Sequence, residues 1–251
     1  MLYHESVLSP RAGVKSLTEQ VRSTKQRTYR KMSRAEDEQR TRARIVDAAE
    51  SLHAEVGPAN TTISAIAGRA GVTRATVYRH FPDDESLFLA CSGQWLSRQV
   101  LPDPHKWDAH DDPLGVLRSG LSDIYRYFRD GEPMLTSVLR DATAVPARVT
   151  ATRLAQEREW RKRLTRGLPG RRRKTVQAAV AHATSFGTWR SLCVDHGLSN
   201  GSAVDLMVAM TAAAAHDAAS GAQPLHAWDR TGPRVGPSSE PAADMAKAWQ
   251  R

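Results

Sequence analysis

The chain has 251 residues, enough for one or two domains with a substantial core. Hydrophobic residues make up 40% of it, and no stretch approaches the roughly 18 consecutive apolar residues that a membrane-spanning helix needs. Its two cysteines, Cys91 and Cys193, form no Cys-Xaa-Xaa-Cys motif or Cys/His cluster, which favours reduced thiols in a cytoplasmic protein. The composition therefore argues against an integral membrane protein and a disulfide-rich secreted domain.

Positive charge is concentrated in two stretches of the chain. The net charge is +9, and residues 1–34 hold eight Lys or Arg and two acidic residues, a local charge of +6. Residues 35–80 are neutral, whereas residues 153–174, with ten basic and two acidic residues, carry +8. We expect residues 1–34 to form a basic, disordered or weakly helical arm that attracts phosphate groups. The second cluster is better explained as a solvated helix face followed by a basic loop.

Four helices are predicted after the arm. The first runs from Glu36 to the Gly-Pro pair at 57–58, and its apolar positions 45, 48, 49 and 52 share one face. A second, short helix begins after Thr62 and ends at Gly71, and a third begins after Thr73, because Thr is a common N-cap and Gly a common stop signal. A fourth starts near residue 82, with acidic residues at its positive dipole end.

The rest of the chain is also predicted to be helical. After a loop at 102–113, helical patterns cover residues 114–130, 132–143, 147–167, 172–196 and 201–217. No segment has the convincing alternation of a strand. The predicted fold is therefore all-α, with an arm at 1–34, a helix-turn-helix domain at 35–82, a helical domain at 83–220 and a disordered tail at 221–251.

The segment from Thr62 to Phe81 has the spacing of a helix-turn-helix. That motif needs a small residue where its two helices cross, a residue that tolerates positive φ in the turn, and an apolar residue on the inner face of the second helix. Ala67, Gly71 and Val77 supply them. The second helix then exposes hydroxyl and guanidinium groups, which can bind phosphates and base edges. The sequence thus predicts a DNA-binding surface.

The same region resembles the TetR family of bacterial repressors. The similarity covers roughly residues 38–90, with matching strings at 45–53, at 61–82 (ending Thr-Val-Tyr-Arg-His-Phe-Pro) and at 85–89. It implies a three-helix DNA-binding domain followed by a larger helical domain that binds a small effector and dimerises. It also implies DNA contacts by Thr62, Ser64, Thr73, Arg74, Thr76, Tyr78, Arg79 and His80. One departure is the acidic pair Asp83-Asp84, where family members often have a phosphate-contacting Lys; we therefore look to the basic arm for such contacts.

The C-terminal helices are expected to hold an effector site and a dimer interface. Residues 171–199 and the Ala-rich helix after them resemble the same family's regulatory domain, and their small residues would let helices pack closely in a four-helix dimer interface. Side chains that could line a ligand cavity, although such residues more often form ordinary core, are Tyr125, Phe128, Met134, Trp160, His182, Phe186 and Trp189. No cofactor and no metal are expected, since the acidic loop at 108–112 matches no metal-binding spacing.

These observations predict a homodimeric, cytoplasmic repressor that binds double-stranded operator DNA, associates with the nucleoid when bound, and is released by a small-molecule effector. One alternative is a ligand-independent activator or nucleoid-associated protein with the same motif, which would show little sequence preference. The other is a helical enzyme regulated by the motif. No nucleophile elbow, P-loop, dinucleotide fingerprint or zinc-protease motif supports that alternative, so we expect no enzymatic activity.

Overall fold

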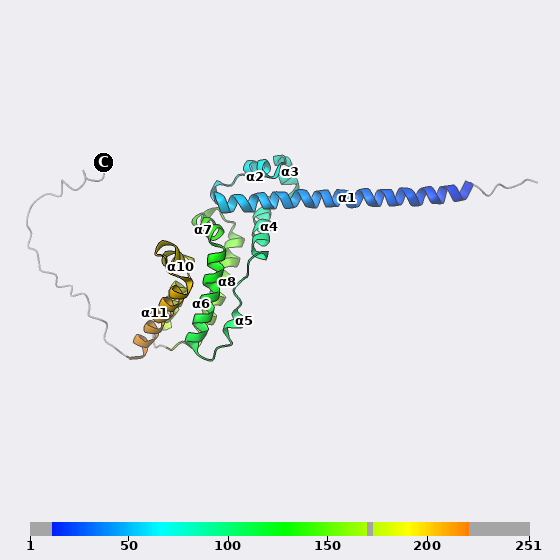
Figure 1. Ribbon diagram of the computed structural model, residues 1–251. Helices are drawn as coiled ribbons and strands as arrows, with labels where there is room; N and C mark the ends of the chain where they lie inside the picture. Colours follow the sequence, from blue (N-terminus) through cyan, green and yellow to red (C-terminus); the bar gives the residue numbers. More distant parts are fainter. Residues whose placement is uncertain (1–11, 170–172, 221–251) are drawn as a thin grey trace, which may run out of the picture.

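One long helix, α1, organises the N-terminal part of the protein. The computed structural model describes residues 12–169 and 173–220, and α1 runs without interruption over Ala12–Glu55. At 1.5 Å per residue its 44 residues extend about 66 Å. Figure 1 shows that its N-terminal half projects beyond the rest of the protein, with α2 and α3 on one side of its other half and α4 on the opposite side.

The start of α1 differs from the prediction of a helix beginning at Glu36. The helix extends back to Ala12, so most of the basic arm is continuous with the first helix of the DNA-binding motif. No Gly or Pro lies between residues 14 and 56, and the Arg, Lys, Gln and Glu residues found there favour helix. The hydrophobic periodicity of the sequence does not reveal this part of the helix, because no side chain between residues 31 and 44 is buried. Residues 1–11 of the predicted arm lie outside the described residues.

After α1 come the 3-10 turn η1 (Pro58–Asn60) and the helices α2 (Ile63–Ala70), α3 (Arg74–His80) and α4 (Asp84–Ser97). A small hydrophobic core joins α1 to α2, α3 and the first half of α4. Its most deeply buried members include Ile45, Ala49 and Val77. The core also contains Leu87 and Cys91 of α4. The N-terminal domain therefore extends past the predicted boundary at residue 82, because the first half of α4 packs against α1.

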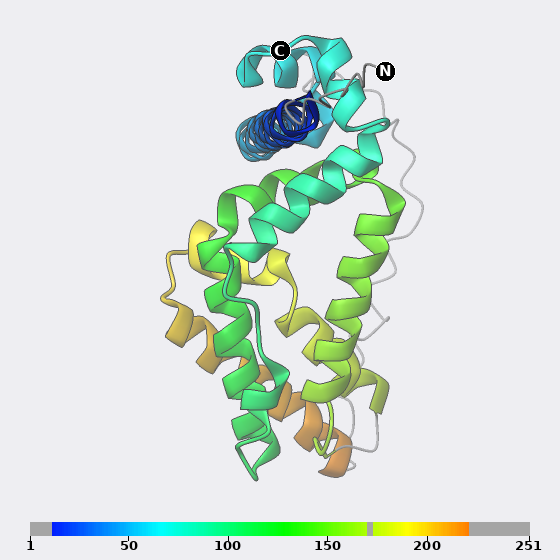
Figure 2. The same ribbon diagram turned by 90° about the vertical axis from the view of Figure 1, so that its right-hand side faces the viewer.

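The C-terminal domain is a second helical layer with its own core. It consists of α5 (Pro104–Trp107), α6 (Pro113–Asp130), α7 (Glu132–Arg140), η2 (Ala142–Ala144), α8 (Ala147–Leu164), α9 (Arg173–Ala183), α10 (Phe186–Arg190), the π-helical turn η3 (Ser191–Asp195) and α11 (Asn200–Ser220). The central helix is α6, which packs against α8 and α11. Figure 2 looks along α1 and shows the N-terminal domain above this layer, with α4 between them.

The all-α prediction is confirmed, since residues 12–169 and 173–220 contain no strand, but two predicted segments are wrong in detail. The predicted loop at 102–113 contains the short helix α5, which Asp103 caps and which buries Trp107 completely. The single helix predicted at 172–196 is interrupted at Thr184-Ser185, where the Thr184 hydroxyl donates to the carbonyl of Val180 at 2.9 Å.

No described helix combines the length and apolar composition needed to cross a bilayer. The predicted tail at 221–251 lies outside the described residues.

Candidate nucleic-acid interface

The helix-turn-helix is fixed by local hydrogen bonds at each helix end. The Thr62 hydroxyl accepts a hydrogen bond from the backbone N–H of Ala65 at 3.1 Å and so caps α2. Gly71 ends α2 in the left-handed region, with φ of 65°, a conformation that a residue with a Cβ adopts only at a cost. Thr73 then caps α3 by accepting from the N–H of Thr76 at 3.2 Å. These bonds determine the angle at which α3 leaves α2.

Two arginines hold this pair of helices to α1. The guanidinium of Arg42 lies 4.6 Å from the ring centroid of Phe81, the residue that ends α3. Arg69 of α2 donates to both carboxylate oxygens of Glu55, at 2.6 and 2.8 Å, and this hydrogen bonding lowers the pKa of Glu55. Both side chains therefore have structural partners, and neither is a prime candidate for reading DNA.

The predicted contact residues fall on α3 and the start of α2. Thr62, Ser64, Thr73, Arg74, Tyr78 and Arg79 are exposed, and Thr76 is half-buried. Among the described residues neither Arg74 nor Arg79 forms an ion pair, and the chain from residue 56 to residue 82 contains no Asp or Glu. The surface thus presents cationic and hydroxyl groups without a neighbouring carboxylate from its own segment, as a phosphate-binding surface requires.

His80 differs from the other predicted contact residues. Its side chain is only partly exposed, and its Nε2 atom is buried without a hydrogen-bond partner among the described residues. His80 ends α3 and comes directly before the buried Phe81. Because Nε2 is directed into the protein, only the rest of the ring is open to a nucleic acid, and the expected contact by His80 is the least supported of the eight.

The acidic pair after α3 has a structural role. Asp83 is the N-cap of α4, and its Oδ1 accepts a hydrogen bond from the N–H of Ser86 at 2.7 Å. The Ser86 hydroxyl in turn donates to the carbonyl of Asp83 at 2.8 Å. Asp84 and Glu85 occupy the first turn, where negative charge is favourable. These residues start α4 and offer no cationic group to a phosphate.

Basic side chains continue along α1 away from α3. Arg44 lies beside the turn, since its Nη1 would be 3.8 Å from a Cβ on Gly71. Lys31 and Arg34 are exposed further along the same helix. They lie about 12–17 Å beyond Arg42, which marks the position of the end of α3. The helical arm is therefore a rigid extension of the surface that carries α3.

Behind this surface a buried histidine and cysteine join α1 to α4. The Sγ of Cys91 lies 3.5 Å from Nδ1 of His53, and the His53 ring packs on Phe88 with centroids 4.7 Å apart. Burial lowers the pKa of His53 to about 4 and raises that of Cys91 to about 12. The pair is therefore a neutral part of the core, with a thiol that is not activated for nucleophilic chemistry.

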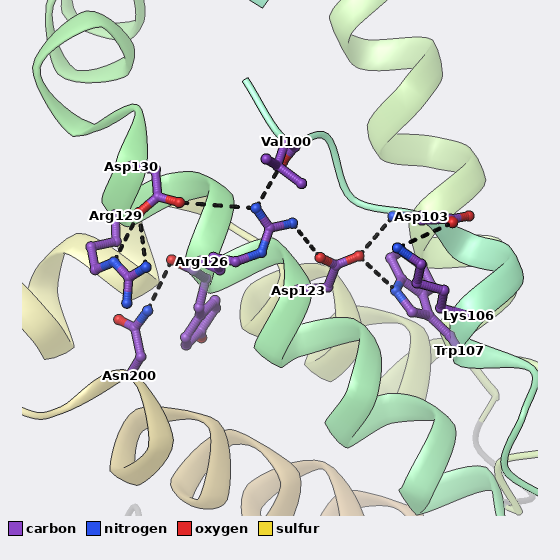
Figure 3. Close-up of polar contacts among 10 residues, drawn as sticks. Val100, Asp103, Lys106, Trp107, Asp123, Arg126, Arg129, Asp130 and Asn200 are labelled. Atoms are coloured by element: carbon purple, nitrogen blue, oxygen red, sulfur yellow. Dashed lines mark hydrogen bonds and ion pairs between the residues drawn. The ribbon is translucent and has the colours of Figure 1, made fainter. Parts of the chain in front are cut away.

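The segment after α4 is tied to α6 by a polar network (Figure 3). Asp123 accepts hydrogen bonds from the N–H of Asp103 at 2.7 Å and from the indole N–H of Trp107 at 3.1 Å, and it also pairs with Arg126. Arg126 donates in addition to the carbonyl of Val100 at 2.9 Å. These bonds lower the pKa of Asp123 against the opposing effect of its burial. The network holds the connection between the two domains against the central helix of the second.

The residues predicted to line a ligand site are only partly brought together. Phe128, Phe186 and Trp189 form one aromatic cluster, with centroid separations of 5.4–6.0 Å. The Tyr125 ring stacks on Phe128, but its hydroxyl already donates to the carbonyl of Ala183 at 2.9 Å. Met134 is half-buried on α7.

Two of the candidate ligand residues stand apart from that cluster. His182 is exposed, with Thr188 as its nearby polar partner, and its helix α9 ends one residue later, at Ala183. Trp160 packs edge-on against Tyr127, and its buried indole N–H has no acceptor among the described residues. The prediction for His182 as a pocket residue is therefore not supported by its position.

Sequence reasoning also missed residues that lie between the two domains. Trp95 of α4 packs edge-on against Tyr127 of α6, with centroids 6.1 Å apart. A Cβ on Gly131, the residue between α6 and α7, would come within 2.9 Å of the same indole. An aromatic residue at the end of a connecting helix is the only sequence signal for this contact.

Among the described residues no group of three or more His, Cys, Asp or Glu is arranged to hold a metal ion.

The N-terminal domain is similar in sequence to known regulatory proteins. Residues 45–91 match the family of bacterial regulatory proteins described as the tetR family. The HTH-type transcriptional regulator TtgR of Pseudomonas putida is 35% identical over 91 residues, which cover 36% of this chain and 43% of TtgR. The HTH-type transcriptional regulator AcrR of Shigella flexneri is 42% identical over 87 residues, which cover 33% of this chain and 39% of AcrR. The chain thus matches less than half the length of these relatives.

A solved structure with a similar arrangement is a TetR-like transcriptional regulator from Rhodococcus sp. RHA1. It superimposes with a TM-score of 0.49 and 17% identity, covering 68% of this chain and 93% of that chain.

Proposed function

We propose that this protein is a sequence-specific transcriptional repressor of the tetR family of bacterial regulatory proteins, which its residues 45–91 match. In this proposal a dimer places its two α3 helices in successive major grooves of operator DNA. A small molecule bound in the C-terminal domain then favours a different placement of the N-terminal domains and lowers operator affinity.

The observation that carries the proposal is the surface of α3. Its exposed side chains include Arg74 and Arg79, which have no ion-pair partner among the described residues, and hydroxyl groups at Thr73 and Tyr78. Arg can bind guanine through two hydrogen bonds, and Thr offers both a hydroxyl and a methyl group to a base edge. The two Thr caps and the Gly71 turn hold this surface in one orientation, which base readout requires.

Dimerisation is part of the proposal for two reasons. One α3 helix has seven residues and can contact few base pairs, so two copies on neighbouring half-sites are needed for useful affinity. The C-terminal helix α11 also exposes apolar side chains, with Leu206 41% and Met210 52% accessible in the single chain. Small residues such as Ala178 of α9 and Ala209 of α11 are exposed as well. These features support α9 and α11 as the dimer interface.

The chemistry of the C-terminal core supports a small aromatic or apolar effector. Phe128, Phe186 and Trp189 offer aromatic faces and edges. The buried indole N–H of Trp160 lacks an acceptor among the described residues, and leaving such a donor unpaired costs about 1–3 kcal/mol. Trp160 is joined to the cluster through Tyr127, whose ring centroid lies 5.9 Å from Phe128 and 6.3 Å from Trp160. An aromatic ligand whose carbonyl or phenolic oxygen reached past Tyr127 would satisfy this donor.

The test compares specific with non-specific DNA binding at one salt concentration. The wild-type protein is used to select a sequence from a random duplex library, and its affinity for that sequence and for the DNA upstream of its own gene is compared with that for an unrelated duplex. We expect a preference of at least about a thousandfold for the selected sequence. A ratio near one would refute the specific repressor and favour a nucleoid-associated protein.

Single substitutions then locate the contacts. Arg79→Ala should lower affinity for the selected sequence by about 1–3 kcal/mol if the side chain binds a base, and should relax the preference at one position. Arg158→Ala, which removes an exposed arginine from α8 in the other domain, is the matched control and should leave both affinities unchanged.

A further inference from the structure

The C-terminal end of α7 holds the turn that leads into the DNA-binding motif. Asp141, whose side chain is 9% exposed, accepts a hydrogen bond from the backbone N–H of Ala59 at 3.1 Å. The Ser137 hydroxyl donates to the carbonyl of Ala54 at 3.0 Å. Arg140 donates to the carbonyl of Val56 at 3.0 Å and pairs with Asp141. We call these three side chains, from residues 137, 140 and 141, the α7 contact.

The α7 contact completes the end of α1. The last carbonyls of a helix have no partner within the helix, and here Ser137 and Arg140 supply donors to two carbonyls at that end. Gly57 follows with φ of 86°, and a Cβ there would overlap the Arg140 guanidinium and the Asp141 carboxylate. The turn of η1 and the Thr61-Thr62 entry to α2 come directly afterwards. The position of α2, and through it of α3, thus depends on side chains of the C-terminal domain.

The opposite end of α7 is joined to the aromatic cluster. Glu132, in the first turn of α7, accepts a hydrogen bond from Arg190 at 3.2 Å, and Thr136 accepts another from the same guanidinium at 3.3 Å. Arg190 ends α10, and it follows Trp189 of the cluster directly. The nine residues of α7 span about 13 Å, so this helix places Glu132 and Asp141 at its two ends, with Thr136 and Ser137 between them. Figure 1 shows α7 between α1 and the helices of the C-terminal domain.

We propose that α7 couples the aromatic cluster of the C-terminal domain to the DNA-binding surface, with Asp141 as the residue that positions the η1 turn. The inference rests on the proposed function and adds the element and residues that connect the two sites. A displacement of α10 moves Arg190, α7 follows through Glu132, and Asp141 moves Ala59 and the start of α2. Hydrogen bonds hold α7 at both of its ends. A measured energetic coupling between those two ends would establish that α7 connects the two sites.

The experiment measures operator binding by the full-length protein, with the sequence selected by the wild type and an unrelated duplex of equal length as probes. Asp141→Ala should weaken binding to the selected sequence by about tenfold or more and leave binding to the unrelated duplex within about twofold. Phosphate attraction does not depend on the exact placement of α3, whereas base contacts do. Asp141→Asn keeps the volume and an acceptor oxygen and should lose only about threefold, which keeps the test informative if Asp141→Ala folds poorly.

A double-mutant cycle tests the coupling itself. Arg190→Ala should change affinity for the selected sequence by about threefold or more in the wild-type background and by less than about twofold in the Asp141→Ala background, because the hydrogen bond from η1 to Asp141 is then lost; the Asp141→Asn background, which keeps an acceptor, should give an intermediate effect. The matched control is Asp108→Ala, which removes a carboxylate that lies between α5 and α6 and pairs with Arg163, and it should change neither affinity.

Three results would overturn the inference: unchanged operator affinity in Asp141→Ala, an equal loss of affinity for both duplexes, or an Arg190→Ala effect that is the same in both backgrounds. Failure of the proposed function is distinguishable, because the wild-type protein would then select no sequence at all.

Discussion

Lowering the pH should destabilise the N-terminal domain through His53. The imidazole is buried between α1 and α4, beside the Cys91 thiol and the Phe88 ring, and burial lowers its pKa from 6.5 to about 4. In the unfolded chain the same imidazole takes up a proton below about pH 6.5. The unfolded state therefore binds more protons than the folded state between pH 6.5 and 4, so stability falls as the pH falls through this window.

The size of the effect follows from the two pKa values. A difference of one pKa unit corresponds to about 1.4 kcal/mol, so the full separation is worth about 3 kcal/mol, of which about 2.5 kcal/mol is lost between pH 7.5 and pH 4.5. Typical domains are stable by only about 5–15 kcal/mol. The protonation of one side chain therefore removes a large part of the stability of the domain that carries the DNA-binding motif.

The assay compares the free energy of urea unfolding at pH 7.5 and 4.5 in the wild type and in His53→Gln. Carboxylates titrate over the same range in both proteins, so the difference between the two pH dependences isolates the imidazole. His105→Gln, at an exposed position, is the control and should behave as the wild type does. An NMR titration of the wild-type His53 imidazole gives an independent value. A pKa near 6.5, or equal pH dependences in the wild type and His53→Gln, would refute the reasoning.

Three further predictions concern the turn, the dimer and the arm. Gly71→Ala should destabilise the protein by about 1–2 kcal/mol because of its positive φ, whereas Gly68→Ala, inside α2 with open space around it, should stabilise it; thermal unfolding distinguishes the two. Met210→Asp should shift the protein from dimer to monomer in light scattering after gel filtration, and an unchanged mass would show that α11 is not the interface. Deleting residues 1–31 should reduce the salt dependence of operator binding, by about 0.9 in the logarithmic slope for each phosphate contact removed, and an unchanged slope would mean that the arm touches no DNA.

The helix-turn-helix could be predicted from sequence because its determinants are local. Thr62 and Thr73 accept hydrogen bonds from residues three positions further on, and Gly71 is needed for its own backbone conformation. The buried positions of the motif recur at helical spacing, so the pattern shows which face packs inward. Thr62, Arg74 and the other proposed contact residues lie on the surface this pattern predicts, except for the buried nitrogen of His80. Their contacts with DNA remain predictions.

The features that sequence reasoning missed depend on exposure or on distant parts of the chain. Hydrophobic periodicity reports burial, so it could not detect the part of α1 over residues 31–44, where no side chain is buried and helix propensity favours the helix. Asp141 and Ala59 are 82 positions apart, and no local pattern indicates such a contact. The break at Thr184-Ser185 changes a predicted long helix into two, and with it the direction of His182. The surface of the helix-turn-helix could therefore be predicted from local sequence patterns, whereas the surroundings of the aromatic cluster, which depend on contacts between distant residues, could not.

At the position directly after α3, an acidic residue favours the start of α4, whereas a basic residue would favour DNA binding. Asp83 accepts a hydrogen bond at the N-terminus of α4, a cap that is typically worth about 0.5–2 kcal/mol, and a Lys at that position could not provide it. A carboxylate near a phosphate repels it, so the affinity that a Lys would add must come from elsewhere on the same surface. Arg44 beside the Gly71 turn and Lys31 and Arg34 further along α1 are the available cations. Because α1 is helical through this region, we expect these cations to keep their positions relative to α3. If they contact DNA phosphates as proposed, a displacement of α3 from its groove would withdraw them from the DNA backbone at the same time.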